Sequence, residues 1–185
     1  MTGTVAVLLA AGGGSRFGGE GHKLLTPFRG APLVAHALAA ALGSGLRTIV
    51  VQGSLDLSGL AAPSVRLVDN PDWRQGQAAS LQAGLEAAAE EDAEAVVVGL
   101  GDQPLVPAAA WAIVAAAEHP IAVATYGGRR GNPVRLARAV WPLLPTEGDE
   151  GARRLMRNRP GMVAAVACPG NPADVDTVED LVRWS

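Results

Sequence analysis

A run of glycines with two cations near the start of the chain is the first place where chemistry is expected. Glycine fills positions 12, 13, 14, 18, 19 and 21, and Arg16 and Lys23 lie within and just after this run. Glycine has no Cβ, so a backbone rich in it can bring several N–H groups onto anionic oxygens, while the cations supply charge. The pattern predicts a loop that binds a polyphosphate, and a glycine-rich surface turn is the alternative.

Two common phosphate-binding motifs do not fit this loop. The dinucleotide pattern G-x-G-x-x-G fails because Phe17 stands where its third glycine belongs. The pattern G-x-x-x-x-G-K-[ST] fails because His22 precedes Lys23 and Leu24 follows it. An anion-binding loop of another kind is therefore expected.

Three aspartates are candidates for a metal site. Asp102 follows an apolar run at 95–100, and Asp174 and Asp176 lie near the other end of the sequence. Carboxylates suit Mg²⁺, which usually takes one or two of them together with phosphate oxygens and water. We expect Asp102 to be one ligand and Asp176 or Asp174 to be the second. Alternatively, Asp102 caps a turn and Asp176 begins a helix.

The segment 70–85 joins a strand to a helix and carries candidates for binding a base or ribose. Gly76 lies at the bend, and Asn70 and Ser80 offer hydrogen bonds near a helix N-terminus, which attracts anions. Without this context Ser80 is an ordinary surface hydroxyl. Trp73 is expected either as a wall of the pocket or as part of the core.

A second basic group lies in the C-terminal half. Arg129, Arg130 and Arg135 surround the segment 131–133, and further arginines fall in 148–154. Arginine forks suit phosphate, so these segments predict a site for a second anionic ligand, with a solvated charged face as the alternative. The histidines show no metal-binding spacing, and Cys168 has no motif that supports a catalytic thiol.

Apolar runs and alanine-rich segments alternate in the order needed to position these residues. Strands are predicted at 5–9, 47–53, 65–70, 95–100 and 162–167, with helices at 31–42, 77–91 and 107–118 and shorter helices at 151–157 and after 176. Two strands joined by a basic turn are expected from 121 to 137. The pattern predicts one α/β domain over 1–185, with helices on both faces of a mostly parallel sheet. The phosphate loop and Asp102 then meet at the carboxyl ends of strands.

Composition narrows the possible partners and compartment. The chain has 185 residues, a formal net charge of −3 and a single cysteine. No long run of one charge suggests nucleic acid or an anionic membrane as a partner, and no apolar run reaches the length of a membrane span. A cytoplasmic protein without disulfides is expected.

Five motifs together resemble the nucleotidyltransferases related to molybdenum cofactor biosynthesis. The segment 9–23 is similar to the family's L-A-A-G-x-x-x-R-[MF]-G…K signature, with a spacer from Arg16 to Lys23 one residue longer than usual. GDQP (101–104), GNPV (131–134), GDEGAR (148–153) and DVDTVEDL (174–181) resemble the later motifs in the family's order. The combination of L-A-A-G and G-D-Q-P resembles the cytidylyltransferase branch, whereas the guanylyltransferase branch typically reads L-A-G-G.

The resemblance implies a Rossmann-like, three-layer nucleotidyltransferase fold, that of nucleotide-diphospho-sugar transferases, with a mostly parallel mixed sheet. It implies transfer from CTP to the terminal phosphate of a molybdopterin cofactor with Mg²⁺, and a molybdenum hydroxylase as the receiver of the product. Alternatives keep the fold but use GTP, a sugar phosphate or a polyol phosphate, or deliver the finished cofactor, or bind NAD(P).

The same resemblance distributes the roles. Arg16, Lys23 and Asp102 are expected to be catalytic, and Asp102 and Asp176 to bind the metal. The nucleotide is assigned to Leu9, Ala10, Ala11, Gly12, Gly13, Gly14, Arg16, Lys23, Asn70, Gly76 and Ser80. The acceptor is assigned to Gly131, Asn132, Pro133, Gly151 and Arg153.

Overall fold

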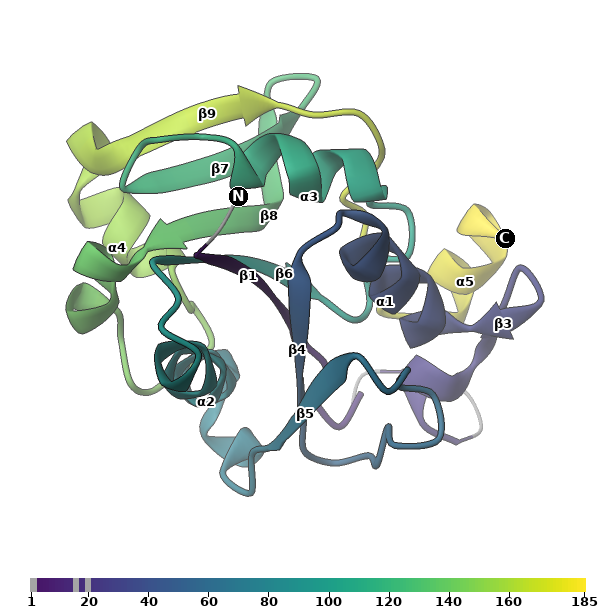
Figure 1. The fold of residues 1–185 in the computed structure, drawn as a ribbon. Helices are drawn as coiled ribbons and strands as arrows, with labels where there is room; N and C mark the ends of the chain where they lie inside the picture. The colour runs from purple at the N-terminus through teal and green to yellow at the C-terminus, as the bar shows by residue number, and fades with distance from the viewer. Residues whose placement is uncertain (1–2, 15–16, 19–20) are drawn as a thin grey trace.

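The computed structural model describes residues 3–14, 17–18 and 21–185, and its centre is a seven-stranded sheet (Figure 1). The strand order is β5-β4-β1-β6-β8-β7-β9. All strands except β8 run in one direction, so the mostly parallel mixed sheet expected from the sequence is confirmed. The strands are β1 (Thr4–Leu9), β4 (Arg47–Gln52), β5 (Val65–Asp69), β6 (Ala95–Leu100), β7 (Ile121–Tyr126), β8 (Arg129–Ala137) and β9 (Val163–Ala167).

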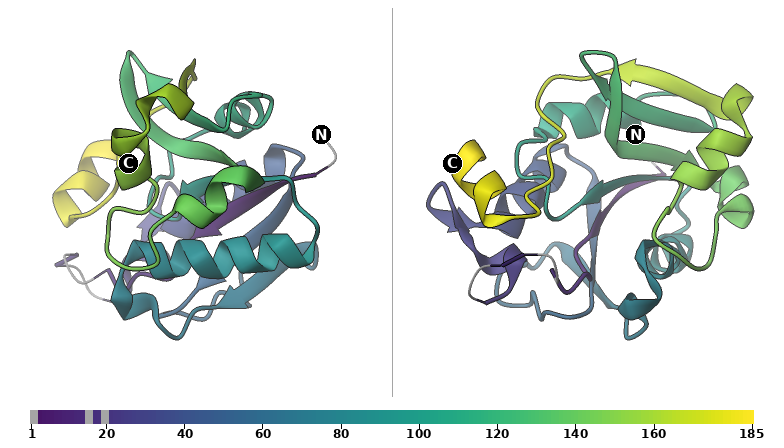
Figure 2. Two further views of the ribbon diagram at one scale, coloured as in Figure 1. Left: turned by 90° about the vertical axis from the view of Figure 1, so that its left-hand side faces the viewer. Right: turned by 180° about the vertical axis from the view of Figure 1, so that it is seen from behind.

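Helices cover both faces of this sheet and form three layers (Figures 1 and 2). Side chains alternate along a strand, and in β1 they divide between two cores. Ala6 and Leu8 pack with α1 (Leu33–Gly43) and α3 (Ala108–Ala115), whereas Val5 and Val7 pack with α2 (Gln77–Glu90) and α4 (Arg153–Asn158). Because both faces are buried, the central strands are apolar throughout, which is the pattern that the sequence shows.

Several predicted boundaries were wrong by a few residues for identifiable reasons. The helix expected from Ala31 begins at Leu33, because β3 (Ala31–Pro32) pairs with β2 (Pro27–Phe28) as a small hairpin. Pro107 precedes α3 as its extended N-cap instead of occupying the first turn. Gly151 has a left-handed φ of 49°, so α4 starts beyond it at Arg153.

The remaining elements are short helices that connect the strands or end the chain. Residues Lys23–Leu25, Trp73–Gln75, Arg138–Leu143 and Pro160–Met162 form short 3-10 helices, of which the last displaces Met162 from the predicted strand. The C-terminal helix α5 (Val178–Trp184) follows the acidic segment. Along the described residues, no helix combines the length and the apolar character needed to cross a membrane.

Candidate functional site

The glycine loop and Asp102 leave neighbouring strands at the same end of the sheet. Leu9, the last residue of β1, pairs with Leu100, the last residue of β6. The amide of Gly101 donates to the Leu9 carbonyl at 2.9 Å, so the two chains stay hydrogen-bonded where the loops after β1 and β6 begin. The strand that follows β1 in this sheet, β4, pairs on one side of β1, and β6 pairs on the other side. Ligands of open α/β sheets bind at such a point, where the strand order changes direction.

The loop folds back so that Gly14 lies against Lys23. Gly14 has a φ of 62°, and a Cβ added there would come within 2.8 Å of the Lys23 Cβ. Only glycine accommodates both the conformation and this approach. Arg16, predicted to bind the triphosphate, lies outside the described residues, so that assignment stays a prediction.

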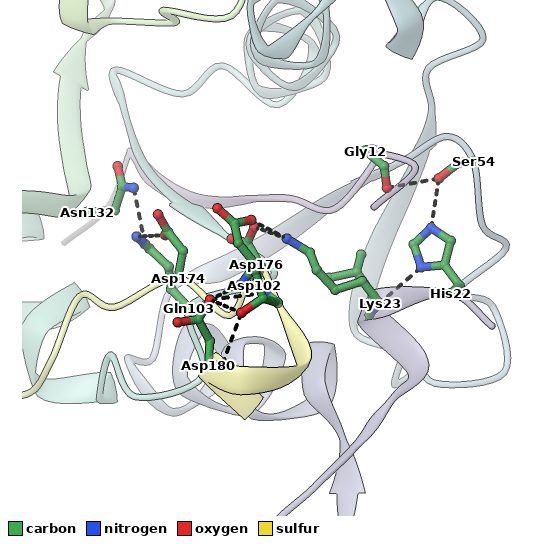
Figure 3. A network of polar contacts seen from close by, with 12 residues as sticks. Gly12, His22, Lys23, Ser54, Asp102, Gln103, Asn132, Asp174, Asp176 and Asp180 are labelled. Atoms are coloured by element: carbon green, nitrogen blue, oxygen red, sulfur yellow. Dashed lines mark hydrogen bonds and ion pairs between the residues drawn. The ribbon is translucent and has the colours of Figure 1, made fainter. Parts of the chain in front are cut away.

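Lys23 lies between the two aspartates that were predicted as metal ligands (Figure 3). Its Nζ is 2.7 Å from Oδ2 of Asp102 and 3.0 Å from Oδ1 of Asp176. Burial disfavours the charge on Lys23, but the charges and hydrogen bonds of both carboxylates outweigh burial and raise the pKa of Lys23. The ammonium group therefore stays charged and holds the start and the end of the chain together.

Val175 fixes the acidic segment 174–176 beside the pocket. Val175 is fully buried, and its amide donates to the Asp102 carbonyl at 3.0 Å. Asp174 and Asp176, on either side of Val175, both line the pocket. The N-cap of α5 is Thr177, which exchanges hydrogen bonds with Asp180, so Asp176 lies directly before the start of this helix.

The donor groups at this point fit a hard divalent cation. Oδ1 of Asp102 is buried and has no hydrogen-bond partner within the described residues, which is costly for a carboxylate oxygen unless a cation reaches it. Asp102 and Asp176 already share a cation in Lys23. In the described ranges no set of three or more His, Cys, Asp or Glu side chains could hold a metal. Two carboxylates completed by phosphate oxygens and water match the preference of Mg²⁺.

A pocket of about 910 Å³ contains most of the predicted nucleotide-binding residues. Trp73 is one wall, since a Cβ added to Gly13 would come within 2.9 Å of its ring, and Trp73 also packs against the core on the α2 side, so both interpretations of it hold. The predicted residues that line this pocket are Leu9, Ala10, Ala11, Gly12, Gly13, Gly14, Lys23, Gly76, Ser80, Asp102 and Asp176. These residues therefore surround one space.

Asn70 and Ser80 form the support of the bend that closes this pocket. The Asn70 Nδ2 donates to Ser80 Oγ at 3.0 Å, and both side chains are buried, so Ser80 is not a surface hydroxyl. Asn70 also accepts from the Asp72 amide and does not line the pocket. Contact of Asn70 with a ligand stays a prediction.

A second pocket of about 480 Å³ contains the predicted acceptor residues Gly131, Asn132, Gly151 and Arg153. Pro133 does not line it, and Arg135 donates instead to the His119 carbonyl. Arg129 and Arg130 also line the second pocket, as does Arg157, which is paired with Glu150 of the same lining. The two pockets share the lining residues Leu9, Gln77, Arg153 and Asp174, so they adjoin one another.

The GDEGAR segment reaches the second pocket by docking on the bend before α2. The Gly148 carbonyl accepts from the Ala78 amide at 2.9 Å, and the Gly148 amide donates to the Gln75 carbonyl at 3.1 Å. Gly76, with a φ of 104°, leaves room for this contact, since a Cβ there would lie 2.7 Å from the Gly148 carbonyl. The two pockets are thus built on one junction.

Residues 6–164 match the family model described as the MobA-like NTP transferase domain. The chain belongs to this family. It is a nucleotidyltransferase, as the ordered motifs predicted, and the match spans most of the chain.

Relatives of this MobA-like chain carry several names. It is 32% identical over 96% of its length to nicotine blue oxidoreductase of Paenarthrobacter nicotinovorans, covering 94% of that protein. It is 32% identical to the purine catabolism protein PucB of Bacillus subtilis, covering 97% and 95% of the two chains. It is 33% identical to the molybdenum cofactor guanylyltransferase of Rhodobacter capsulatus, covering 96% and 92%.

Solved structures agree with the fold of the MobA-like domain. The structure of Rv0371c from Mycobacterium tuberculosis superposes with a TM-score of 0.84 at 29% identity, covering 98% of this chain and 97% of that one. A complex of Rv0371c with manganese has a TM-score of 0.74 at 26% identity, covering 99% and 98%.

Two side chains of this MobA-like domain that shape the site were not predicted from the sequence. Gln103 lies between Asn132, which is predicted to bind the acceptor, and Asp174 (Figure 3). His22 accepts from the Leu24 amide through Nδ1, so its Nε2 carries the proton and donates to Ser54 Oγ at 3.0 Å. Ser54 in turn donates to the Gly12 carbonyl at 3.0 Å. Burial lowers the pKa of His22, opposed by a backbone hydrogen bond with Gly12 and assisted by the charge of Lys23.

Cys168 has surroundings unlike those of a reactive thiol. Burial raises its pKa, and its Sγ lies near backbone carbonyls of Val166 and Ala110. Reactive thiols have lowered pKa values and cationic neighbours. The prediction that Cys168 has no catalytic role agrees with this environment.

Proposed function

We propose that the protein transfers the cytidylyl group of CTP to the terminal phosphate of a molybdopterin cofactor, forming molybdopterin cytosine dinucleotide and pyrophosphate. The observation that carries this proposal is the junction between the two pockets, which Asp174 and Arg153 share. A triphosphate in the larger pocket and an anionic acceptor in the smaller one would meet there. The acceptor oxygen would form a bond to the α-phosphorus as the bond from that phosphorus to the β-phosphate oxygen breaks.

The roles assigned to the chain's own residues are binding and positioning. The amides of the glycine loop and Lys23, with Arg16, would bind the triphosphate, and Arg153 would steer the acceptor phosphate. Asp102 and Asp176 would hold Mg²⁺, which when bound would neutralise charge on the phosphates. No covalent enzyme intermediate is needed, because positioning and charge stabilisation are sufficient for phosphoryl chemistry.

Support for cytosine comes from Ala11. It lines the larger pocket with 1% of its surface exposed, and a Cβ on Gly53 would lie 3.0 Å from its methyl group. The guanylyltransferase-type signature places glycine at this position, which would leave more space. The name of the Rhodobacter capsulatus relative makes GTP the alternative donor.

Support for a molybdopterin-type acceptor comes from the smaller pocket, which combines arginines with an apolar floor that includes Leu81, Leu136 and Met156. Such a pocket suits a flat ring carrying a phosphate better than a small polyol phosphate. A molybdenum hydroxylase is the proposed recipient of the product.

The test is a reconstituted reaction with purified protein, molybdopterin cofactor, a divalent cation and one nucleotide at a time. We expect pyrophosphate and the cytosine dinucleotide only when CTP, Mg²⁺ and the acceptor are all present. Equal turnover with GTP would contradict the choice of base, and turnover with a sugar or polyol phosphate would contradict the acceptor. Binding of the dinucleotide product without turnover would indicate a delivery protein.

A second candidate function has one observation in its favour, the name nicotine blue oxidoreductase on a relative 32% identical over most of the chain. The same pocket would then bind NAD(P). Loss of NAD(P)H absorbance with an electron acceptor, together with no CTP turnover, would favour this candidate. Thermal shifts with CTP, GTP and NADH provide the matching binding measurement.

A further inference from the structure

We propose that Gln103 is a positioning residue that fixes which end of the Asn132 amide faces the acceptor pocket. Asn132 then presents its side-chain oxygen, Oδ1, and selects an acceptor with an N–H donor at that point. The inference rests on the proposed function for the identity of the acceptor, but the orientation of the Asn132 side-chain amide follows from contacts within the chain.

The orientation of Gln103 is determined by a group that can only accept. Its side chain is buried, with 5% of the residue exposed, and its Nε2 lies 3.0 Å from the Pro172 carbonyl oxygen. A carbonyl oxygen has no proton to donate, so the NH₂ group of Gln103 must face it. The same NH₂ group lies 2.6 Å from Oδ1 of Asp174. The opposite end, Oε1, must therefore face Asn132.

The orientation of the Gln103 amide in turn determines that of the Asn132 amide. The Gln103 Oε1 is only an acceptor, so the Asn132 amide must turn its Nδ2 toward it, and the two atoms lie 3.1 Å apart. The Asn132 backbone is fixed separately, because the Tyr126 hydroxyl donates to its carbonyl at 2.6 Å. Figure 3 shows the Asn132 side-chain oxygen pointing away from Gln103.

The remaining atom of the amide defines the chemistry of the subsite. Asn132 lines the smaller pocket, and no described residue forms a hydrogen bond with its Oδ1. This oxygen accepts from N–H or O–H and disfavours anionic oxygens. The arginines of the same pocket suit the phosphate, and the apolar floor suits a flat ring. A heterocycle with N–H groups at its edge, as in a pterin, fits all three features.

The experiment compares wild-type protein with Gln103→Met, which keeps the side-chain length but removes both hydrogen-bonding ends. Without Gln103 the Asn132 amide can present either end. We expect the KM for the molybdopterin acceptor to rise about five- to tenfold, corresponding to the loss of one hydrogen bond, while the KM for CTP stays within about twofold. The matched control is Gln82→Met, because Gln82 donates to the Pro145 carbonyl and lines neither pocket.

A second measurement is independent of substrate. Selective ¹⁵N labelling of asparagine reports the side-chain amides, and we expect the Asn132 signal to shift in Gln103→Met and not in Gln82→Met. An unchanged Asn132 signal would overturn the proposal, as would a rise in the KM for CTP or a change in the preferred base without an effect on the acceptor. Absence of turnover by the wild-type protein would instead contradict the proposed function, and the amide spectrum would still decide the orientation of the Asn132 side-chain amide.

Discussion

The Nζ of Lys23 lies 2.7 Å from Oδ2 of Asp102, so a cation from the glycine loop is bound to the aspartate at the end of the neighbouring strand. Asp176 holds the same Nζ from the other end of the chain. The ammonium group thus occupies a position between the two carboxylates that are proposed to bind Mg²⁺. Binding of metal and nucleotide should release Lys23 toward the phosphates.

The first prediction concerns Asp102→Asn, which keeps the shape of the side chain but removes its charge. We expect the rate of pyrophosphate release to fall by about two to three orders of magnitude, because the side chain can no longer stabilise the cation at the phosphates. Circular dichroism and thermal unfolding should show the same fold. Asp92→Asn is the control, since Asp92 is exposed and its left-handed φ of 53° suits asparagine. Comparable rates for the two variants would exclude the metal-binding role.

The second prediction concerns the pKa of Lys23, the only lysine in the sequence. The ion pairs with Asp102 and Asp176 raise the pKa of Lys23 in the folded protein. They therefore stabilise the fold fully at pH values below the pKa of the unfolded chain, about 10.4, and this stabilisation is lost as the pH rises through the pKa of the folded protein. Reductive methylation with ¹³C-formaldehyde gives one lysine signal to titrate. We expect the pKa of Lys23 to fall in Asp102→Asn. An unchanged pKa in this variant would show that the ion pair does not set the charge of Lys23.

The third prediction concerns His22, whose neutral form connects Leu24, Ser54 and Gly12. Its pKa is lowered in the folded protein, so below about pH 6.5 the unfolded chain takes up a proton that the folded chain resists. Stability should therefore decrease as the pH falls through this range. Denaturant midpoints between about pH 5 and 8 measure the effect.

The control for this prediction is His22→Gln, which retains a donor for Ser54 and does not titrate. The stability of the wild type relative to this variant should decrease as the pH falls from about 8 to 5. Parallel curves would mean that His22 is not the titrating group.

The fourth prediction concerns the choice of base. Ala11→Gly removes a buried methyl group that faces Gly53, and we expect the rate with GTP relative to CTP to rise about tenfold, the effect of one methyl group in a specificity pocket. Ala10→Gly is the matched control, because Ala10 is also buried and lines the same pocket. An equal change in both variants would indicate loosening of the strand end, not selection of the base.

Much of the sheet could be predicted from the sequence because its central strands are buried on both faces. The runs at β1, β4 and β6 are therefore apolar throughout, and their carboxyl ends correctly brought the glycine loop and Asp102 together. The hairpin of β2 and β3 was missed because each strand has only two residues, which is too short for a periodic pattern.

The hydrogen-bond networks of the site could not be predicted. Gln103 contacts Asn132 and Asp174, which are 29 and 71 residues away along the chain, so no local spacing reveals the partnership. His22 depends in the same way on Ser54. The hydrogen bond of Asn70 to Ser80 was not foreseen either, whereas contact of Asn70 with a ligand stays a prediction.

Helix α5 has no fully buried residue, and a short peripheral helix of this kind ordinarily frays. The ion pair of Lys23 with Asp176 attaches the segment before α5 to the end of the glycine loop, and the hydrogen bond of Val175 to Asp102 attaches it to the loop after β6. Occupancy of the site should therefore reach the helix as slowed amide hydrogen exchange. The rate of amide hydrogen exchange in α5 would then report whether substrate is bound in the pocket.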